Sequence, residues 1–397
     1  MAQESQLPLA CRLRLSVRMV AVAVTVLCGF AMLKNQTLHS SGPSRLELKT
    51  CSPRNNVAFL KTHKCASSAI QNILFRYGDK HNLHFALPDF GNHLGGRRTF
   101  KAAMVRSSPL NKVTPNIFAI HTKWDHAEVK KVMPEDTIFF TIVREPTALF
   151  HSLFVYSNFH EITGLTLQEY VKRVPADSGR IKGVFGYNQM SWDFGIPLED
   201  MNNLSAIHEL VRRADEQFGL VLVMERMDES LVLLAEYLCW ELSDVLVLRV
   251  NSLKDKFKPS ISEEALQALQ QKLAPDYLLY NHFLERFNQQ VEDFGRARMA
   301  AAVARLQELM ALLVSKCNFI KKGASELRGG QKPWSYKVSV QGEGSSSHLA
   351  PAREIFHRVV LQVDGIESGG GGGCDVYTLA EIQYIDVLRK KQQRTIA

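Results

Sequence analysis

Short, continuous apolar runs alternate with helical patterns through the middle of the chain. Residues 137–143 read Thr-Ile-Phe-Phe-Thr-Ile-Val, and Pro146 follows where the first position of a helix is expected. Residues 220–224 and 245–250 are similar runs, and residues 231–240 between them have helical spacing. Strands that are apolar along their whole length are typical of a parallel sheet covered by helices on both faces. The sequence therefore predicts an α/β fold.

The chain changes character beyond residue 260. Ser260 and Glu263 have the spacing of a capping box, and helical periodicity continues to about Cys317. After that the pattern fades, and the five-glycine run 369–373 is typical of a linker. We therefore expect the α/β domain to carry a helical C-terminal extension.

A single apolar segment near the N-terminus predicts membrane attachment. Residues 19–33 carry no charge, follow Arg12, Arg14 and Arg18, and end at Lys34. As a helix the run spans about 22 Å, against a hydrocarbon core of roughly 30 Å, unless its flanks extend it. We expect an anchor whose preceding arginines stay in the cytosol, with a cleaved signal peptide as the alternative. The expected parts are a cytosolic tail (1–18), a transmembrane signal-anchor (19–33), a stem (34–50), a luminal domain (51–320) and a divergent, partly low-complexity C-terminal segment (321–397).

The charge balance favours an anionic partner without naming it. Forty-eight Lys and Arg residues face forty Asp and Glu residues, which gives a formal net charge of +8. No run of five like charges and no zinc-finger or basic-zipper spacing is present, so nucleic acid is not indicated. The seven cysteines include no Cys-x-x-Cys pair, so neither a metal centre of that kind nor a disulfide scaffold is expected.

A polar loop joins an early apolar run to the first helix. Residues 56–60 form the run, and the loop after it contains Lys61, Lys64, Ser67 and Ser68. A helix N-terminus presents unpaired N–H groups and a positive dipole end, to which lysines add charge and serines add hydroxyl donors. The loop therefore predicts a phosphate site, although it lacks the glycines of a Walker A motif. The alternative is that Ser67 only caps the helix and the lysines are solvated.

A second candidate loop follows the run at residues 137–143. Arg144 stands at the carboxyl end of that strand, and Ser152 lies eight residues later, two turns into the next helix. Open α/β sheets bind ligands at the carboxyl ends of their strands. An arginine there can form two parallel hydrogen bonds to a phosphate, and Ser152 can reach the same oxygens. We therefore expect a second phosphate site.

Taken together, the two loops resemble the paired phosphate loops of sulfotransferases, which use 3′-phosphoadenosine 5′-phosphosulfate (PAPS). Longer stretches, including Asn72-Ile-Leu-Phe-Arg-Tyr-Gly and Leu238-Cys-Trp-Glu-Leu, are similar to the Golgi galactose 3-O-sulfotransferases. Within that family the segment from Cys51 is most similar to galactosylceramide sulfotransferase. The resemblance covers residues 51 to about 320. It implies a P-loop-NTPase-like sulfotransferase fold and a single-pass type II protein of the Golgi membrane, with its catalytic domain in the lumen.

The resemblance also implies which residues bind the donor and what is transferred. The 5′-phosphosulfate would be held by Lys64, Ser67 and Ser68, with Lys61 beside them, and the 3′-phosphate by Arg144 and Ser152. The implied reaction moves the sulfuryl group to the 3-hydroxyl of a terminal β-galactose, on galactosylceramide or a related glycolipid. The alternatives are N-acetyllactosamine-type glycans as acceptors, or a non-catalytic PAPS-binding relative. A luminal P-loop kinase is disfavoured, because the loop lacks glycines and no acidic strand end is placed for Mg²⁺.

Sulfuryl transfer needs a base for the acceptor hydroxyl and positive charge near the leaving phosphate, but it needs no metal. His121 follows the apolar residues 116–120, and we predict that it is the base, since an imidazole titrates near pH ~6.5. Lys64 is predicted to stabilise the bridging oxygen as the bond breaks. His63, inside the first loop, and His84 are the alternative bases.

The C-terminal segment resembles the family only in part. Pro333-Trp334 and Cys374 with Glu381-Ile382-Gln383-Tyr384 are similar to the outer pieces of the family pattern, whereas residues 335–373 are unlike it. If the missing stretch helps to close the PAPS site, the protein binds PAPS weakly or is inactive. The resemblance also implies a disulfide between Cys317 and Cys374. It leaves a homodimer open.

Overall fold

The structure is a computed structural model, and it describes residues 51–248, 261–317, 320–322, 337–339, 374–377, 379 and 381–396. The chain divides into two compact units, Met1–Cys51 and Ser52–Ala397, and the second holds the helices and strands given below. The predicted cytosolic tail, signal-anchor and stem lie outside the described residues, and the predicted part boundaries stay predictions. In the part of the chain that the structure describes, no helix has the length and apolar character needed for a membrane span.

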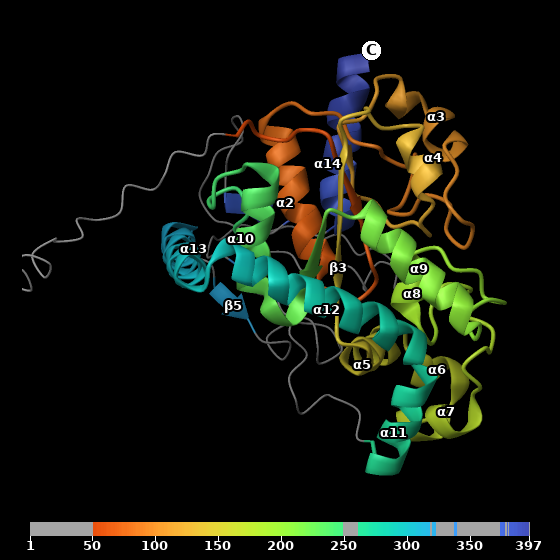
Figure 1. The fold of residues 1–397 in the computed structure, drawn as a ribbon. Coiled ribbons are helices and arrows are strands. Elements are labelled where there is room, and N and C mark those ends of the chain that lie inside the picture. The colour runs from red at the N-terminus through yellow and green to blue at the C-terminus, as the bar shows by residue number, and fades with distance from the viewer. Residues whose placement is uncertain are drawn as a thin grey trace, which may run out of the picture. The chain divides into compact units, whose positions relative to one another are not determined.

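A four-stranded parallel sheet forms the centre of the second unit (Figure 1). Its strands lie in the order β2-β1-β3-β4, with β1 at Val57–Leu60, β2 at Ile117–Phe118, β3 at Ile138–Val143 and β4 at Leu220–Val223. Each strand is parallel to its neighbours. β1 and β4 are buried at every position, which explains why their sequences show no polar alternation. The predicted fold class, an α/β fold with a parallel sheet flanked by helices, is confirmed.

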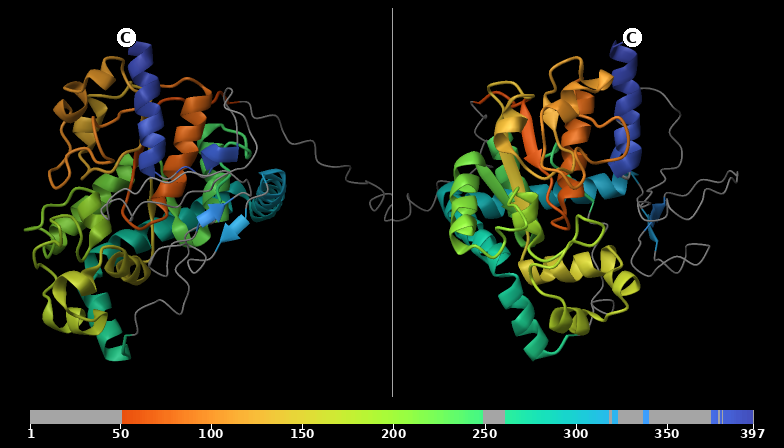
Figure 2. Two further views of the ribbon diagram at one scale, coloured as in Figure 1. Left: turned by 180° about the vertical axis from the view of Figure 1, so that it is seen from behind. Right: turned by 90° about the vertical axis from the view of Figure 1, so that its right-hand side faces the viewer.

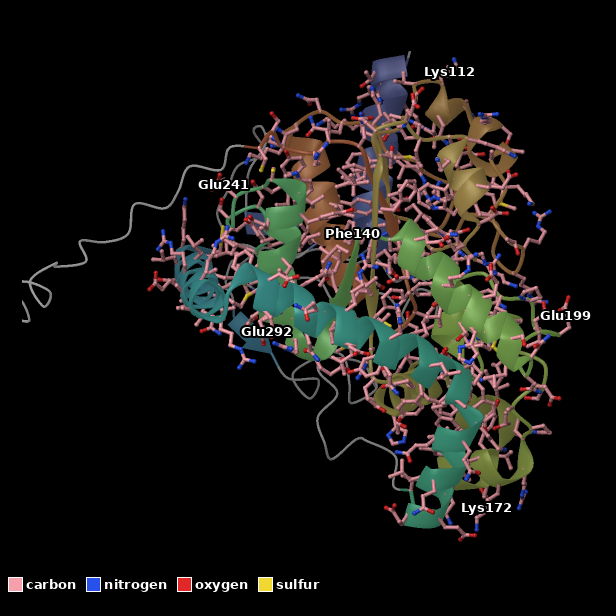
Figure 3. All side chains as sticks on the ribbon, in the orientation of Figure 1. Lys112, Phe140, Lys172, Glu199, Glu241 and Glu292 are labelled. Carbon is pink, nitrogen blue, oxygen red and sulfur yellow. A yellow bond between two sulfur atoms is a disulfide. The ribbon has the colours of Figure 1, made fainter. Side chains whose placement is uncertain are left out.

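Helices cover both faces of this sheet. The α-helices are α2 (Ser67–Lys80), α3 (Ala103–Arg106), α4 (His126–Lys130), α5 (Pro146–Tyr156), α6 (Phe159–Thr163), α7 (Leu167–Arg173), α8 (Gln189–Asp193), α9 (Leu204–Gln217), α10 (Met227–Leu238), α11 (Glu263–Lys272), α12 (Ala274–Phe294), α13 (Arg296–Cys317) and α14 (Glu381–Ile396). The short elements are the 3-10 helices η1 (Pro109–Asn111), η2 (Met224–Arg226) and η6 (Cys374–Tyr377) and the antiparallel strands β5 (Ile320–Lys322) and β6 (Lys337–Ser339). Helices α2 and α14 lie on one side of the sheet, and α9 and α12 on the other (Figure 2). In Figure 3, Phe140 of β3 lies at the centre between these layers, where its ring stacks on Phe59 at 4.9 Å.

The helical extension consists of three helices. The N-cap of α11 is Ser262, whose hydroxyl accepts from the Ala265 N–H, so the capping box predicted at Ser260 is wrong. Ser260 itself lies outside the described residues. Pro275 lies at the start of α12, because proline has no N–H with which to continue α11. Gly295, with a φ of 91°, separates α12 from α13.

The apolar run at residues 245–250 is not a strand over its described part. Residues 245–248 are irregular, although Val245 and Leu246 are buried. The Leu246 carbonyl accepts a hydrogen bond from the Arg76 guanidinium instead of from a neighbouring strand. A short apolar run therefore predicted burial here but not strand pairing, which periodicity alone does not determine.

The C-terminal helix α14 packs against α2. Tyr384 meets the ring of Phe75 edge-on, with ring centroids 5.5 Å apart. The Gln392 side chain bonds both backbone groups of Phe85 and so ties α14 to the chain that follows α2. A helix from the segment predicted as divergent is thus part of the folded unit.

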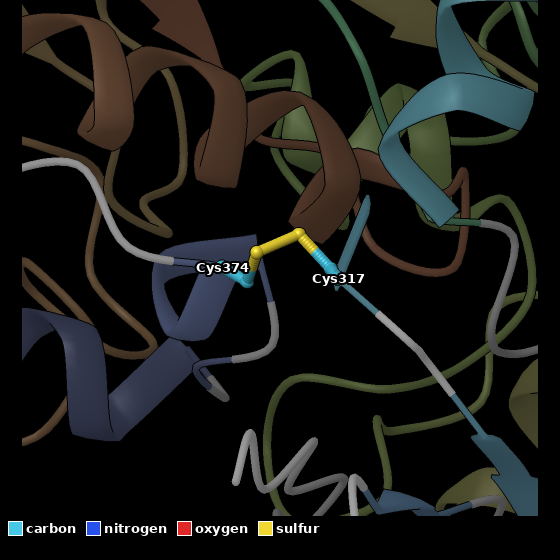
Figure 4. Close-up of a disulfide and its surroundings, with 2 residues drawn as sticks. All are labelled: Cys317 and Cys374. Atoms are coloured by element: carbon cyan, nitrogen blue, oxygen red, sulfur yellow. A yellow bond between two sulfur atoms is a disulfide. The ribbon is translucent and has the colours of Figure 1, made fainter. Parts of the chain in front are cut away.

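A disulfide joins α13 to the turn that precedes α14. Cys317 ends α13 and Cys374 begins η6, and their bond is drawn in Figure 4. Next to it, the Asn72 side chain on α2 donates to the Val376 carbonyl at 3.0 Å. The predicted pairing of Cys317 with Cys374 is confirmed, and it holds the start of α14 beside α2.

Candidate functional site

The loop between β1 and α2 has an unusual backbone conformation. Lys64 and Ala66 have φ angles of 60° and 57°, in the left-handed region that residues with side chains rarely adopt. Ser67 closes the loop by donating its hydroxyl proton to the Thr62 carbonyl at 2.5 Å. Left-handed residues in such a loop turn neighbouring N–H groups toward one point, and this arrangement binds anions. The alternative that Ser67 only caps α2 is wrong, because Ala66 is the N-cap and makes no side-chain hydrogen bond there.

Replacing Ala66 by glycine should raise the free energy of unfolding by about 0.5–1 kcal/mol. The left-handed conformation costs a residue with a Cβ roughly 1–2 kcal/mol, and the greater freedom of glycine in the unfolded chain offsets part of that gain. The matched control is Ala69→Gly inside α2, which should lower the same free energy by about 0.5–1 kcal/mol. Urea unfolding followed by circular dichroism measures both. A destabilised Ala66→Gly protein would contradict the assigned backbone conformation.

The two lysines of the loop lie in different environments. Lys61 is buried, with its Nζ 3.0 Å from the Ser68 hydroxyl and 3.2 Å from the Glu381 carboxylate. Burial lowers the pKa of Lys61, and the Glu381 carboxylate opposes this only in part. Lys64 is half-buried, and its Nζ lies 3.7 Å from the centroid of the Tyr156 ring. Burial, followed by the charges of a neighbouring arginine and of Lys61, lowers the pKa of Lys64 to about 7.

Arg144 connects the two predicted phosphate loops. It follows β3, and its Nη1 donates to the Lys64 carbonyl at 2.8 Å. Its Nε is buried and has no hydrogen-bond partner within the described residues. Ser152 lies half-buried on α5, and no hydrogen bond joins its side chain to Arg144 in the described structure. A buried guanidinium N–H without a partner is unfavourable unless a ligand supplies an acceptor, which fits the predicted anion site.

Three histidines from separate parts of the chain stack beside the first loop. The ring centroids of His63 and His121 lie 4.2 Å apart, and those of His93 and His121 lie 5.0 Å apart. Burial lowers the pKa of His121 well below its ordinary value, and burial followed by the charge of His63 lowers that of His93 to about 4. Both rings are therefore neutral at pH 7, which is the form that a general base needs.

Hydrogen bonds at Nδ1 orient His63, which belongs to the loop, and His121, which stacks on it. The Nδ1 of His63 lies 2.8 Å from a carboxylate oxygen of Asp193, and the Nδ1 of His121 lies 3.1 Å from the Lys61 carbonyl oxygen. Carboxylate and carbonyl oxygens accept hydrogen bonds, so each Nδ1 is the nitrogen that carries the proton, and a neutral ring then has its lone pair on Nε2. The Nε2 of His63 is sealed from solvent and has no hydrogen-bond partner among the described residues.

His84 lies at the other end of the sheet. Its backbone carbonyl accepts from the N–H groups of Asn116 and Ile117 at the amino end of β2, whereas His121 follows the carboxyl end of that strand. Parallel strands place their carboxyl ends at one edge, where the two loops also lie. This position removes His84 as an alternative base.

Glu381, at the start of α14, is a site residue that the sequence analysis missed. Its carboxylate accepts hydrogen bonds from Ser68 at 3.1 Å and Asn92 at 2.9 Å, and it pairs with Lys61. It also lies 3.9 Å from the Nε2 of His121. Burial acts to raise the pKa of Glu381, but the charge of Lys61 and the three hydrogen bonds bring it below its ordinary value. Glu381 is therefore ionised and joins the first loop to the histidines.

Asp193 and His93 were missed as well. Asp193 is buried at the end of α8 and accepts from both the backbone N–H and the ring of His63. Neither residue belongs to a motif with a recognisable spacing. For Glu381 a signal was present, because the sequence Glu381-Ile382-Gln383-Tyr384 matches the family pattern beyond a stretch that does not.

The candidate site thus places the predicted anion cradle next to stacked imidazoles at the carboxyl ends of the strands. The cradle consists of the β1–α2 loop, the N-terminus of α2 and Arg144. The rings of His63 and His121 lie beside it. Such a site can bind a phosphorylated donor and take a proton from a hydroxyl held next to it.

Comparisons with known proteins identify several similar chains. The family model described as galactose-3-O-sulfotransferase matches residues 2–342 of the chain. Galactose-3-O-sulfotransferase 3 of Mus musculus is 33% identical over 361 residues, which cover 85% of this chain and 78% of the relative. Galactosylceramide sulfotransferase of Homo sapiens is 36% identical over 271 residues, which cover 65% of this chain and 62% of the relative. Galactose-3-O-sulfotransferase 2 of Homo sapiens is 33% identical over 273 residues, 67% of this chain and 68% of the relative.

Proposed function

The chain belongs to the galactose-3-O-sulfotransferase family, and on that premise we propose that it moves a sulfuryl group from PAPS to the 3-hydroxyl of a terminal β-galactose. The predicted family resemblance is confirmed, and the chain is a sulfotransferase. As the acceptor we propose galactosylceramide or a related glycolipid, since one relative is a galactosylceramide sulfotransferase. N-acetyllactosamine-type glycans are the alternative acceptor, because other relatives are named only for galactose.

The observation that carries this proposal is the meeting of the β1–α2 loop with Arg144. Lys64 and Ser68 would bind the 5′-phosphosulfate, with Lys61 behind them. Ser67 would contribute its backbone N–H, because its hydroxyl is engaged by the Thr62 carbonyl. The 3′-phosphate would lie against Arg144, whose buried Nε needs an acceptor, and against Ser152.

The proposed mechanism is a direct in-line transfer. The Nε2 of His121 takes the proton of the galactose 3-hydroxyl, and the oxygen attacks sulfur as the bond from sulfur to the bridging phosphate oxygen breaks. Lys64 stabilises the negative charge that develops on that oxygen, and the nucleotide leaves as the 3′,5′-bisphosphate. His121 is favoured over His63 as the base, because the Nε2 of His63 is sealed from solvent. No step requires a metal.

An acceptor panel with labelled PAPS tests this function. The full-length protein is assayed with galactosylceramide, lactosylceramide and lactosamine, with and without EDTA. Transfer that persists in EDTA and is lost in Lys64→Ala, but retained in the exposed control Lys130→Ala, supports the proposal. PAPS binding without transfer to any acceptor would favour the non-catalytic relative, and Mg²⁺-dependent transfer from ATP would favour a kinase.

PAPS binding should weaken as the pH rises above about 7. The pKa of Lys64 is about 7 without ligand, and a bound anion stabilises its charged form, so binding takes up a proton. The affinity for PAPS is therefore highest below that pH, and it falls by about tenfold for each pH unit above it. Lys64→Arg stays charged throughout and should bind with little pH dependence. Calorimetry measures the dissociation constant of PAPS for both proteins across the pH range. If the dissociation constants of wild type and Lys64→Arg change equally with pH, Lys64 does not titrate in the site.

We also propose that the protein is held in the Golgi membrane by one span, with the folded domain in the lumen. The support is the apolar run 19–33 behind its arginines. Protease treatment of intact Golgi vesicles should leave the folded domain uncut. Cleavage without detergent would reverse the proposed orientation.

A further inference from the structure

The stacked histidines His63, His93 and His121 all present the same nitrogen as a free ligand atom. The nearest partners of the Nδ1 atoms of His63 and His121 are accepting oxygens at 2.8 and 3.1 Å, and the Gln189 amide nitrogen lies farther from the His63 Nδ1, at 3.4 Å. The Nδ1 of His93 lies 2.8 Å from the side-chain oxygen of Asn92, whose amide nitrogen donates to the Glu381 carboxylate and so fixes the amide orientation. Each Nδ1 is therefore protonated and each Nε2 carries a lone pair.

The three rings bring possible ligand nitrogens close together. The three histidines offer ring nitrogens within 4.8 Å of one another. The buried Nε2 of His63 has no hydrogen-bond partner in the described part of the chain, which is unfavourable for a polar atom. Histidines that bind a metal commonly donate Nδ1–H to a carboxylate or carbonyl, which is the pattern found here.

The charged groups around the three histidines are also compatible with a bound cation. Lys61 is a positive group that acts on His121, and its charge is offset by Glu381 at 3.2 Å. Asp193 adds a second carboxylate at 2.8 Å from His63. Glu381 lies 3.9 Å from the Nε2 of His121, where it can complete a set of three nitrogens and one oxygen. Neutral imidazoles and a carboxylate are ligands that zinc prefers.

We propose that His63, His93 and His121 bind a zinc ion and that the bound ion inhibits sulfuryl transfer. At Zn–N distances of about 2.0–2.1 Å, the nitrogens of a tetrahedral site stand roughly 3.4 Å apart, so the stacked rings have to turn toward one common point to bind the ion. The ion takes the Nε2 lone pair of His121, so that nitrogen no longer accepts the proton of the acceptor hydroxyl. Zinc binding is independent of the proposed function, whereas the inhibition rests on it.

Cobalt spectroscopy tests the binding without an activity assay. The full-length protein is stripped with EDTA, dialysed and titrated with Co²⁺. We expect one equivalent to give the intense visible bands of tetrahedral cobalt and Zn²⁺ to displace it. His93→Gln should weaken binding at least tenfold, and the exposed control His208→Gln on α9 should not change it. Zn²⁺ should also raise the melting temperature of the wild type, which provides a second readout if His93→Gln folds poorly.

Several results would overturn the proposal. Weak octahedral spectra, no shift in melting temperature, or equal affinity of His93→Gln and wild type would exclude the site. Binding without loss of transfer would exclude the inhibition. If no acceptor is sulfated at all, the proposed function fails, while the cobalt titration still decides the zinc site.

Discussion

Replacing His121 by alanine should lower kcat for sulfuryl transfer by about 10²–10⁴-fold and leave PAPS binding nearly unchanged. The ring is neutral, its Nδ1–H donates to the Lys61 carbonyl, and its Nε2 lies 3.9 Å from the Glu381 carboxylate, which also pairs with Lys61. Removing it takes away the proton acceptor but none of the groups proposed to hold the donor. The measurement is initial rate against acceptor concentration, with PAPS affinity determined separately by calorimetry.

The matched comparison is His63→Ala, because His63 has the orienting carboxylate of Asp193. If His121 is the base, the His63→Ala protein should lose less activity than His121→Ala. Its loss would arise only because the His121 ring no longer stacks on His63 and shifts its position. A larger loss of kcat in His63→Ala than in His121→Ala, with PAPS binding retained, would transfer the role to His63. Asp193→Asn should then reproduce that loss and alter the pH profile.

Replacing Glu381 by alanine should lower the free energy of unfolding by about 3 kcal/mol. Lys61 is 1% exposed, and the substitution leaves its ammonium group buried without a charged partner, which typically costs about 3–5 kcal/mol. The low pKa of Lys61 reduces this cost, because the lysine can lose its proton in the folded state. Transfer activity should fall with stability, since Ser68 and Asn92 lose the same acceptor.

Lys390→Ala, at an exposed position of the same helix, is the control and should change stability by less than about 0.5 kcal/mol.

The contribution of Glu381 to stability should depend on pH with a defined sign. The folded pKa of Glu381 is below its ordinary value of 4.5, so its contribution is present above that pH and is lost as the pH falls through the folded value. Urea unfolding at several pH values compares Glu381→Ala with wild type. If wild type stays more stable than Glu381→Ala at the lowest pH, the stabilisation does not come from an ion pair between Glu381 and Lys61.

Local patterns predicted most of the fold. The apolar runs identified β1, β3 and β4, because a strand buried on both faces must be apolar throughout. Pro146 identified the first turn of α5, where Glu145 accepts from two backbone N–H groups. The run at residues 245–250 was misleading, since a short apolar segment can be buried without pairing.

By itself the sequence determined which residues of this sulfotransferase form the predicted anion cradle. Lys61, Lys64, Ser67, Ser68 and Arg144 follow strands of one parallel sheet, and the carboxyl ends of such strands meet at one edge. Only the tertiary structure decided what faces that cradle. Glu381 lies 313 residues from Ser68, and Asp193 lies 130 residues from His63. No local pattern encodes such pairs, because they depend on how α14 and α8 pack against the sheet.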